Sequence, residues 1–344
     1  MAALEKLAAA QKKLREQVSR VVVGQDEVVE QLLVSILAGG HCILEGVPGL
    51  AKTLLVQTLA RSLTLDFGRI QFTPDLMPAD ITGTDVIFED RQSGHREFKF
   101  VKGPIFTNIL LADEINRTPP KTQAALLQGM QERNISTGGR HYPLPKPFFV
   151  LATQNPIEQE GTYPLPEAQL DRFLMKILVS YPTREEERLI YKMTTGAAPD
   201  EPEQVLSGDE VLELQSLVRR VPISDTLVDY TMSLVRATRK EDVEAPDFVR
   251  KWALWGVGPR GGQSLILAAK ARAALHGRPE VSAEDLQAMA PAVLRHRVVL
   301  SYNAEADGQT PDTLIGRLVE SVPVYGGAAA ADGRVQRALK SQGA

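Results

Sequence analysis

A glycine-rich loop at residues 46–53, GVPGLAKT, constrains the fold of this chain more than any other segment. It follows an apolar run at 42–44 and leads into an amphipathic segment at 52–63, which is the strand–loop–helix pattern of a phosphate cradle. Its glycines let successive backbone N–H groups turn toward a polyanion. Lys52 would bring a positive charge to the β- and γ-phosphates, and the Thr53 hydroxyl would hold Mg²⁺ at the start of the helix.

The loop departs from the general pattern G-x-x-x-x-G-K-[ST] at one position, because Ala51 stands where the last glycine would be. We expect alanine to be tolerated if this residue has the right-handed helical conformation. The alternative interpretation is a glycine turn with an incidental lysine, but the flanking strand and helix favour a phosphate loop. The candidate nucleotide contacts in the loop are Gly46, Val47, Pro48, Gly49, Leu50, Ala51, Lys52, Thr53 and Leu54.

Composition excludes several classes of function. The formal net charge of −4 over 344 residues gives no general basic surface, which argues against nucleic acid as the main partner. The single cysteine, Cys42, cannot form an intrachain disulfide, and no uncharged stretch is long enough to cross a bilayer. We therefore expect a cytoplasmic protein with no signal peptide and no transmembrane segment. The five histidines are scattered without ligand spacing, so a transition metal is not expected.

The pattern along the chain predicts two domains. An amphipathic helix at 4–21 should pack on the core, and four further apolar runs, at 69–73, 109–113, 148–153 and 173–179, suit a parallel sheet. After 182 the pattern becomes helical, with segments at 211–218, 226–238, 262–275 and 283–294. The predicted organisation is an N-terminal helix (1–22), an α/β nucleotide-binding domain (23–181), a smaller all-α domain (182–322) and a loose tail (323–344).

Two insertions interrupt the predicted sheet. Residues 85–89 and 97–101 could pair around a turn that contains Gly94, and residues 134–136 and 140–142 could pair around Gly138 and Gly139. Both read as β-hairpins. Periodicity alone favours simple surface elaboration for both.

Polar side chains follow two of the predicted strands. The strand 109–113 ends in Asp113 and Glu114, at the same sheet edge as the loop; Asp113 would hold Mg²⁺ and Glu114 would act as general base on the attacking water. The strand 148–153 leads to Asn155, which could orient water or contact the γ-phosphate if this strand lies between the two motif strands. The alternatives are a simple strand end and an asparagine that caps a strand before proline.

In combination these motifs resemble the MoxR-type AAA+ ATPases. GVPGLAKT matches Walker A, ILLADEINRTPPKTQ matches Walker B, and ATQNP matches sensor 1; GTYPLPEAQLDRF and GPRGG match further family segments. The resemblance extends over about 23–297. It implies a sheet ordered 5-1-4-3-2 with helices on both faces, a C-terminal helical lid and a ring, usually a hexamer, with ATP at subunit interfaces. It also implies that the first hairpin interrupts helix 2 and the second precedes sensor 1, and that such hairpins face the channel of the ring.

The resemblance also assigns roles to single residues. It implies that Asn155 is sensor 1, that Arg172 is the arginine finger and that Arg260 is sensor 2. Without the resemblance, the alternative for both arginines is an ordinary surface residue. It further implies that Val23 and Gly24 line the adenine.

The function implied is an ATP-hydrolysing, chaperone-like remodeller or assembly factor, with a von Willebrand factor A domain protein as partner and an unidentified client. A metal-chelatase-type motor subunit is the nearest alternative. A nucleotide-gated scaffold with little turnover is an alternative of another class, and a DNA motor is disfavoured because no helix-turn-helix or zinc module is recognisable.

Overall fold

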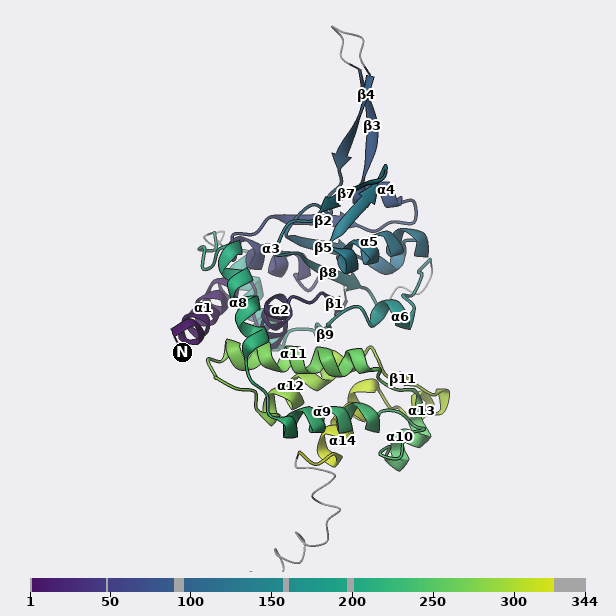
Figure 1. Cartoon of the computed structure of the whole chain (residues 1–344). Helices are drawn as coiled ribbons and strands as arrows, with labels where there is room; N and C mark the ends of the chain where they lie inside the picture. The colour runs from purple at the N-terminus through teal and green to yellow at the C-terminus, as the bar shows by residue number, and fades with distance from the viewer. Residues whose placement is uncertain (1, 48, 90–95, 157–160, 197–200, 325–344) are drawn as a thin grey trace, which may run out of the picture. The chain divides into compact units, whose positions relative to one another are not determined.

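The chain forms two compact units. The computed structural model describes residues 2–47, 49–89, 96–156, 161–196 and 201–324 (Figure 1). Contacts divide it into Ala2–Leu217 and a unit that begins at Val218, inside helix α8 (Gly208–Arg220). This division lies later than the boundary expected at 181/182, because α8 is tied to the first unit. Gln215 Nε2, for example, donates to the carbonyl of Ile36 at 2.7 Å.

The first unit is built on a five-stranded parallel sheet in the order β2-β5-β8-β1-β9. Read from β9, this is the order 5-1-4-3-2 in the numbering of the core strands, which confirms the expected fold. The strands are β1 (Cys42–Glu45), β2 (Phe67–Gln71), β5 (Ile109–Asp113), β8 (Phe149–Gln154) and β9 (Met175–Leu178).

Both faces of this sheet are covered because successive side chains of a strand point to opposite sides. Ile43, Leu110 and Val150 belong to one buried cluster with the apolar side of α5 (Pro120–Glu132). The alternate residues face the other side, where α3 (Lys52–Ser62) contacts β2 and β5. The core strands are therefore almost wholly apolar, as is usual in a parallel sheet that is buried on both faces.

Helices at the N-terminus and after β9 complete the first unit. Leu7, Leu14 and Val18 of α1 are buried at the spacing that a helix predicts, and α1 packs against α3. The remaining helical elements of this unit are α1 (Ala2–Ser19), α2 (Asp26–Ala38), α4 (Pro78–Thr82), η1 (Ile115–Arg117), α6 (Glu167–Leu170) and α7 (Arg184–Thr194).

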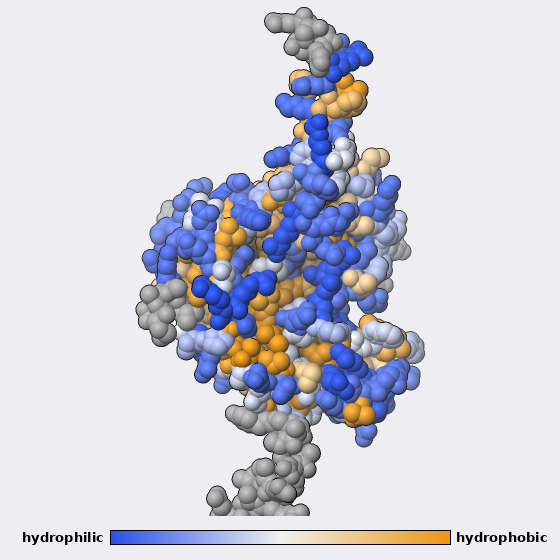
Figure 2. All heavy atoms as spheres, viewed as in Figure 1, coloured by the Kyte–Doolittle hydropathy of each residue, from blue (hydrophilic) through white to orange (hydrophobic). Residues whose placement is uncertain are grey.

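Both predicted hairpins form. Strand β3 (Gly83–Glu89) pairs with β4 (Arg96–Lys102), and β6 (Asn134–Thr137) pairs with β7 (Arg140–Pro143). The first turn lies outside the described residues. Phe100 of β4 stacks on Tyr142 of β7 with ring centroids 4.1 Å apart, so the two hairpins pack together. The β3–β4 ribbon exposes four large apolar side chains, those of Ile87, Phe88, Phe98 and Val101. Orange spheres are visible along this ribbon in Figure 2.

The second unit is helical, with one feature that periodicity did not predict. β10 (Ala253–Trp255) and β11 (Val299–Leu300) form a short antiparallel pair. The helices are α9 (Asp225–Ala237), α10 (Asp247–Trp252), α11 (Pro259–Leu275), α12 (Ala283–Leu294), α13 (Tyr302–Ala306) and α14 (Pro311–Ser321). Of the expected tail, 325–344 lies outside the described residues. In the described parts of the chain, none of the helices combines the length and apolar character needed to span a bilayer.

Candidate functional site

The predicted phosphate loop lies at the carboxyl end of the parallel sheet, between β1 and α3. Lys52 is the first residue of α3, and its Nζ atom donates to the carbonyl of Gly46 at 2.5 Å and to that of Val47 at 3.4 Å. The ammonium is thus folded back over the loop, inside the space that a phosphate group would share. Pro48 lies outside the described residues.

The conformation of Ala51 corrects the expectation from the sequence. Ala51 caps α3 with φ 54° and ψ 23°, which is left-handed and not right-handed helical backbone. A Cβ atom in this region costs roughly 1–2 kcal/mol, which is why a glycine is the usual occupant. The alanine therefore introduces local strain at the position where the general motif has glycine.

The charged side chain of the loop interacts with the acidic side chains at the strand ends. Partial burial lowers the pKa of Lys52, and the charges of Asp113, Glu114 and Glu45 act in the opposite direction. These three carboxylates come from the ends of β5 and β1, on either side of β8. The predicted cation and both predicted acids of the site therefore share one edge of the sheet.

Asp113 is held by two neighbouring strands. Its Oδ1 atom accepts from the hydroxyl of Thr153 at 2.6 Å, and its Oδ2 atom accepts from Nη2 and Nε of Arg69 at 2.7 and 3.1 Å. Thr153 is buried on β8, and Arg69 is on the edge strand β2. Both carboxylate oxygens therefore have protein partners.

Glu114 adopts left-handed backbone, with φ 58°, directly after β5. Its N–H donates to the hydroxyl of Thr153 at 2.8 Å. Its Oε2 atom accepts from Nε2 of Gln71 at 2.7 Å and from Nη1 of Arg117 at 3.0 Å. Because the backbone leaves strand geometry at Glu114, its side chain points in a different direction from that of Asp113. The two acids can therefore serve different purposes.

A cavity of about 450 Å³ lies beside the loop. Val23 and Gly24, which the resemblance assigns to the adenine, are among the residues that line it, and Gln25 connects this segment to the loop through a 3.2 Å hydrogen bond from Nε2 to the carbonyl of Leu50. Another part of the lining was not anticipated from the sequence. It comes from the end of β9 and from α7, and its members are Leu178, Ser180, Tyr181, Pro182, Glu187, Ile190, Tyr191 and Thr194.

Position 24, at the rim of this cavity, requires a glycine. Gly24 has φ 72°, and a Cβ atom there would lie 2.2 Å from the side chain of Glu186 at the start of α7. Glu186 is fixed in a capping box with Thr183, so the N-terminal segment and α7 can approach closely only without a side chain at position 24.

The other three predicted site residues occupy different places. Asn155 follows β8, which lies between β1 and β5, and is 5% exposed; the condition set for its role is therefore met by the topology. Arg172 is exposed between α6 and β9, and its Nη1 atom donates to the carbonyl of Leu127 at 3.4 Å. Arg260 belongs to the second unit, in the first turn of α11.

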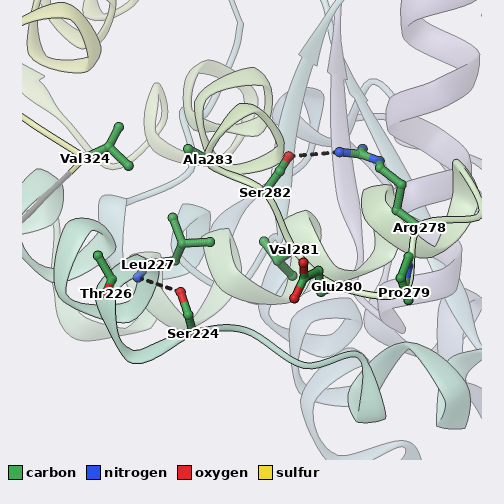
Figure 3. A pocket seen from close by; sticks show the side chains of 10 residues that line it. All are labelled: Ser224, Thr226, Leu227, Arg278, Pro279, Glu280, Val281, Ser282, Ala283 and Val324. Atoms are coloured by element: carbon green, nitrogen blue, oxygen red, sulfur yellow. Dashed lines mark hydrogen bonds between the residues drawn. The ribbon is translucent and has the colours of Figure 1, made fainter.

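Arg260 lines a cavity of about 520 Å³ together with Arg219 and Lys270. A second cavity of this unit, of about 490 Å³, lies between the starts of α9 and α12 (Figure 3). There Ser224 is the N-cap residue of α9, and the hydroxyl oxygen of Ser282 accepts a hydrogen bond from Nη1 of Arg278 at 2.8 Å. The predicted site residues are absent from the lining of this second cavity.

The donor set suits a magnesium ion that is shared with phosphate. Mg²⁺ prefers oxygen ligands and is commonly held by one or two carboxylates, water and substrate phosphates. The Asp113 carboxylate and Thr53 hydroxyl are such donors. Within the described ranges there is no group of three or more His, Cys, Asp or Glu side chains that could hold a metal by itself.

Comparisons with known proteins place these observations in a family. Residues 41–175 match the family described as ATPases associated with various cellular activities (AAA), and residues 251–318 match the AAA lid domain. The chain is 48% identical to Chaperone MoxR1 of Mycobacterium tuberculosis, over 92% of this chain and 87% of that protein. It is 33% identical to protein MoxR of Paracoccus denitrificans, over 88% and 93%. The crystal structure of a protein from Cytophaga hutchinsonii superposes with a TM-score of 0.85 at 43% identity, covering 94% of this chain and 98% of that one.

Proposed function

The chain belongs to the MoxR-type AAA+ ATPases, and we propose that it hydrolyses ATP with Mg²⁺ to remodel or assemble partner proteins. The observation that carries the proposal is the position of Lys52. Its charge interacts with those of Asp113 and Glu114, at the sheet edge where the phosphate loop lies. A lysine, a hydroxyl and two acids with separate anchors are what phosphoryl transfer to water requires.

The roles follow from the contacts of each side chain. When ATP binds, the ammonium of Lys52 leaves the carbonyls of Gly46 and Val47 and donates to the β- and γ-phosphates instead. Thr53 and Asp113 hold the metal. Mg²⁺, when bound, neutralises charge on the phosphates. Glu114 accepts a proton from the water that attacks the γ-phosphorus, the bond to the bridging oxygen breaks, and ADP leaves.

The cavity beside the loop is the proposed adenine site. Its apolar lining, which includes Val23, Leu178 and Ile190, suits a flat ring, and the exposed side chains of Tyr181 and Tyr191 also line it. A pocket of this kind provides most of its affinity by burial and its orientation through a few polar groups. Val23 lies near the start of the first unit's sequence, and Leu178 and Ile190 lie near its end.

The remaining residues are proposed to link subunits and units. Asn155 orients water or the γ-phosphate from the strand between the two motif strands. Arg172 is exposed, which supports a role toward ATP held by a neighbouring subunit in a ring, usually a hexamer. Arg260 starts a long helix of the second unit and would connect phosphate charge to that unit.

The partner and the cellular location are part of the same proposal. Family membership supports a von Willebrand factor A domain protein as the partner, with the client still to be identified. The only cysteine, Cys42, is buried on β1, which suits a reducing, cytoplasmic compartment.

One observation favours the alternative of a nucleotide-gated scaffold with low turnover. Glu114 Oε2 already accepts two hydrogen bonds, from Gln71 and Arg117, so these two donors compete with the attacking water for that oxygen of the general base. Steady turnover of ATP would exclude the scaffold. A metal-chelatase-type motor has no such observation in its favour.

Two variants of the full chain test the proposal. Lys52→Ala should lose ATP binding in calorimetry while its circular dichroism stays unchanged, because Lys52 is the charge that the loop directs at phosphate. Glu114→Gln should bind ATP but turn it over roughly 10²- to 10⁴-fold more slowly. Unchanged ATP affinity in Lys52→Ala would contradict the site. Affinity capture with Glu114→Gln and ATP should then retain the partner for mass spectrometry.

A further inference from the structure

Arg69 occupies one of the two oxygens through which Asp113 could hold a metal ion. Two of its nitrogens donate to a single atom, Oδ2 of Asp113, at 2.7 and 3.1 Å, while Thr153 holds the other oxygen. The Asp113 side chain is 15% exposed and that of Arg69 is 48% exposed. The guanidinium therefore covers the carboxylate from the solvent side, whereas Thr153 supports it from within the sheet.

The position of Arg69 follows from the strand register. Gln71 of β2 lies directly opposite Asp113 of β5, and Arg69 lies opposite Leu111. Since alternate residues share a face, Arg69 and Gln71 point to the same side of the sheet as Asp113. Arg69 thus reaches Asp113 diagonally, and this long side chain can swing toward solvent without any movement of the backbone.

Arg69 also connects the two acids of the site. Its Nη2 atom donates to Oε1 of Gln71 at 2.7 Å, and Nε2 of the same amide donates to Glu114 at 2.7 Å. The first bond fixes which end of the Gln71 amide faces Glu114. If Arg69 moved away from Asp113, the Gln71 amide would therefore be held less firmly and would restrain Glu114 less.

We propose that Arg69 is an exchangeable counter-ion of Asp113, which neutralises this acid before the metal arrives and is displaced when Mg²⁺ and nucleotide bind. This inference rests on the proposed ATPase function. Two cations cannot share one carboxylate oxygen without repulsion, so each must bind more weakly in the presence of the other. Arg69 therefore sets the Mg²⁺ concentration at which the site is completed, and it acts as a positioning residue that does not itself touch the reacting atoms.

The test compares the full chain with Arg69→Met, which keeps most of the apolar stem but removes the charge and both donors. The probe is a fluorescent, non-hydrolysable ATP analogue, titrated at increasing Mg²⁺ and in EDTA. We expect the half-saturating Mg²⁺ concentration to fall about 2- to 5-fold, the range that loss of a partly exposed ion pair allows. We expect binding in EDTA to weaken, because Asp113 would then face the phosphates without a counter-charge.

Two control variants separate this role from a structural one. Arg96→Met removes another exposed ion pair, with Glu89 at 3.2 Å in the β3–β4 hairpin, and should leave the Mg²⁺ dependence unchanged. Gln71→Leu removes the link to Glu114 and one acceptor of Arg69 but leaves the contact between Arg69 and Asp113, and should change the Mg²⁺ dependence less than Arg69→Met does. Urea denaturation of each variant shows whether the fold is retained.

The outcomes distinguish this inference from the proposed function. An Arg69→Met protein that is folded and binds the analogue with an unaltered Mg²⁺ dependence would show that Arg69 only braces the edge strand, and would overturn the inference alone. If the unmodified chain fails to bind the analogue at any Mg²⁺ concentration, the proposed function fails and the inference fails with it.

Discussion

The hydroxyl of Thr153 donates to Oδ1 of Asp113 at 2.6 Å and accepts from the backbone N–H of Glu114 at 2.8 Å. One buried side chain on β8 thus fixes both acids at the end of β5. Because one bond reaches a side chain and the other reaches the backbone, Thr153 determines the rotamer of Asp113 and the start of the left-handed turn at Glu114.

Thr153→Val should test this arrangement, because valine has nearly the same shape but no hydroxyl. It leaves the N–H of Glu114 and one oxygen of Asp113 without a partner, which should destabilise the first unit by about 1–3 kcal/mol. ATP turnover should fall more than ATP affinity, since Lys52 is unaffected. Urea denaturation and steady-state kinetics measure the two effects. Thr153→Ser keeps the hydroxyl and serves as the control; equal turnover in both variants would contradict the assigned role.

Ala51→Gly should stabilise the protein. The left-handed backbone at φ 54° strains an alanine but not a glycine, and we expect a gain of about 0.5–1 kcal/mol after the greater flexibility of glycine in the unfolded chain is included. Ala124→Gly is the matched control, because Ala124 is exposed in the interior of α5 and should lose about 1 kcal/mol. Destabilisation by both substitutions in thermal unfolding would show that Ala51 is not strained.

His41 should make the first unit less stable in mild acid. Burial is the main reason that its pKa is lowered to about 4; the charge of Arg133 also lowers it, and the contact with the Met130 carbonyl opposes the shift. Nδ1 accepts the N–H of Val150 at 3.0 Å, so the neutral ring is the form that fits. Since the folded pKa lies below the unfolded value, the stability of the neutral form is fully present above pH 6.5 and is lost as the pH falls toward 4.

The full loss, from a pKa difference of about 2.5, is about 3 kcal/mol and is reached below pH 4, and about 2 kcal/mol of it should be present at pH 5. Urea denaturation followed by circular dichroism at pH 7.5 and pH 5 measures it. The difference between the two pH values should shrink in His41→Gln and stay the same in His141→Gln, which replaces an exposed histidine. An unchanged pH dependence in His41→Gln would assign the effect to other groups.

Arg172 should act on ATP held by a neighbouring subunit. Arg172→Ala should bind ATP yet hydrolyse it about 10³- to 10⁵-fold more slowly, which is the range measured for arginine fingers. Mixed with Lys52→Ala under conditions in which subunits exchange, it should regain activity, because some sites then combine an intact loop with an intact finger. If a tag confirms exchange and activity stays absent at every mixing ratio, the finger does not act between subunits.

Much of the fold could be predicted from the sequence because its signals are local. The apolar runs that became β1, β5 and β8 are continuous, as strands buried on both faces must be, and the glycine-rich loop marks which strand begins the site. The capping box of Ser282 and Asp285 placed the start of α12 correctly at Ala283. The order of the strands came from the family resemblance, since spacing along the chain does not specify which strands are neighbours.

The tertiary structure alone decided the lateral contacts of the site. Arg69 and Gln71 meet Asp113 and Glu114 because β2 pairs with β5 in one register, and a shift by one residue would turn both side chains to the other face. Tyr181 and Tyr191 line the same cavity as Val23 only because the chain returns there after all five strands of the sheet. The sequence by itself determined the chemical groups and the strands that carry them. Which groups touch was decided by register and packing, because these depend on residues far apart in the chain.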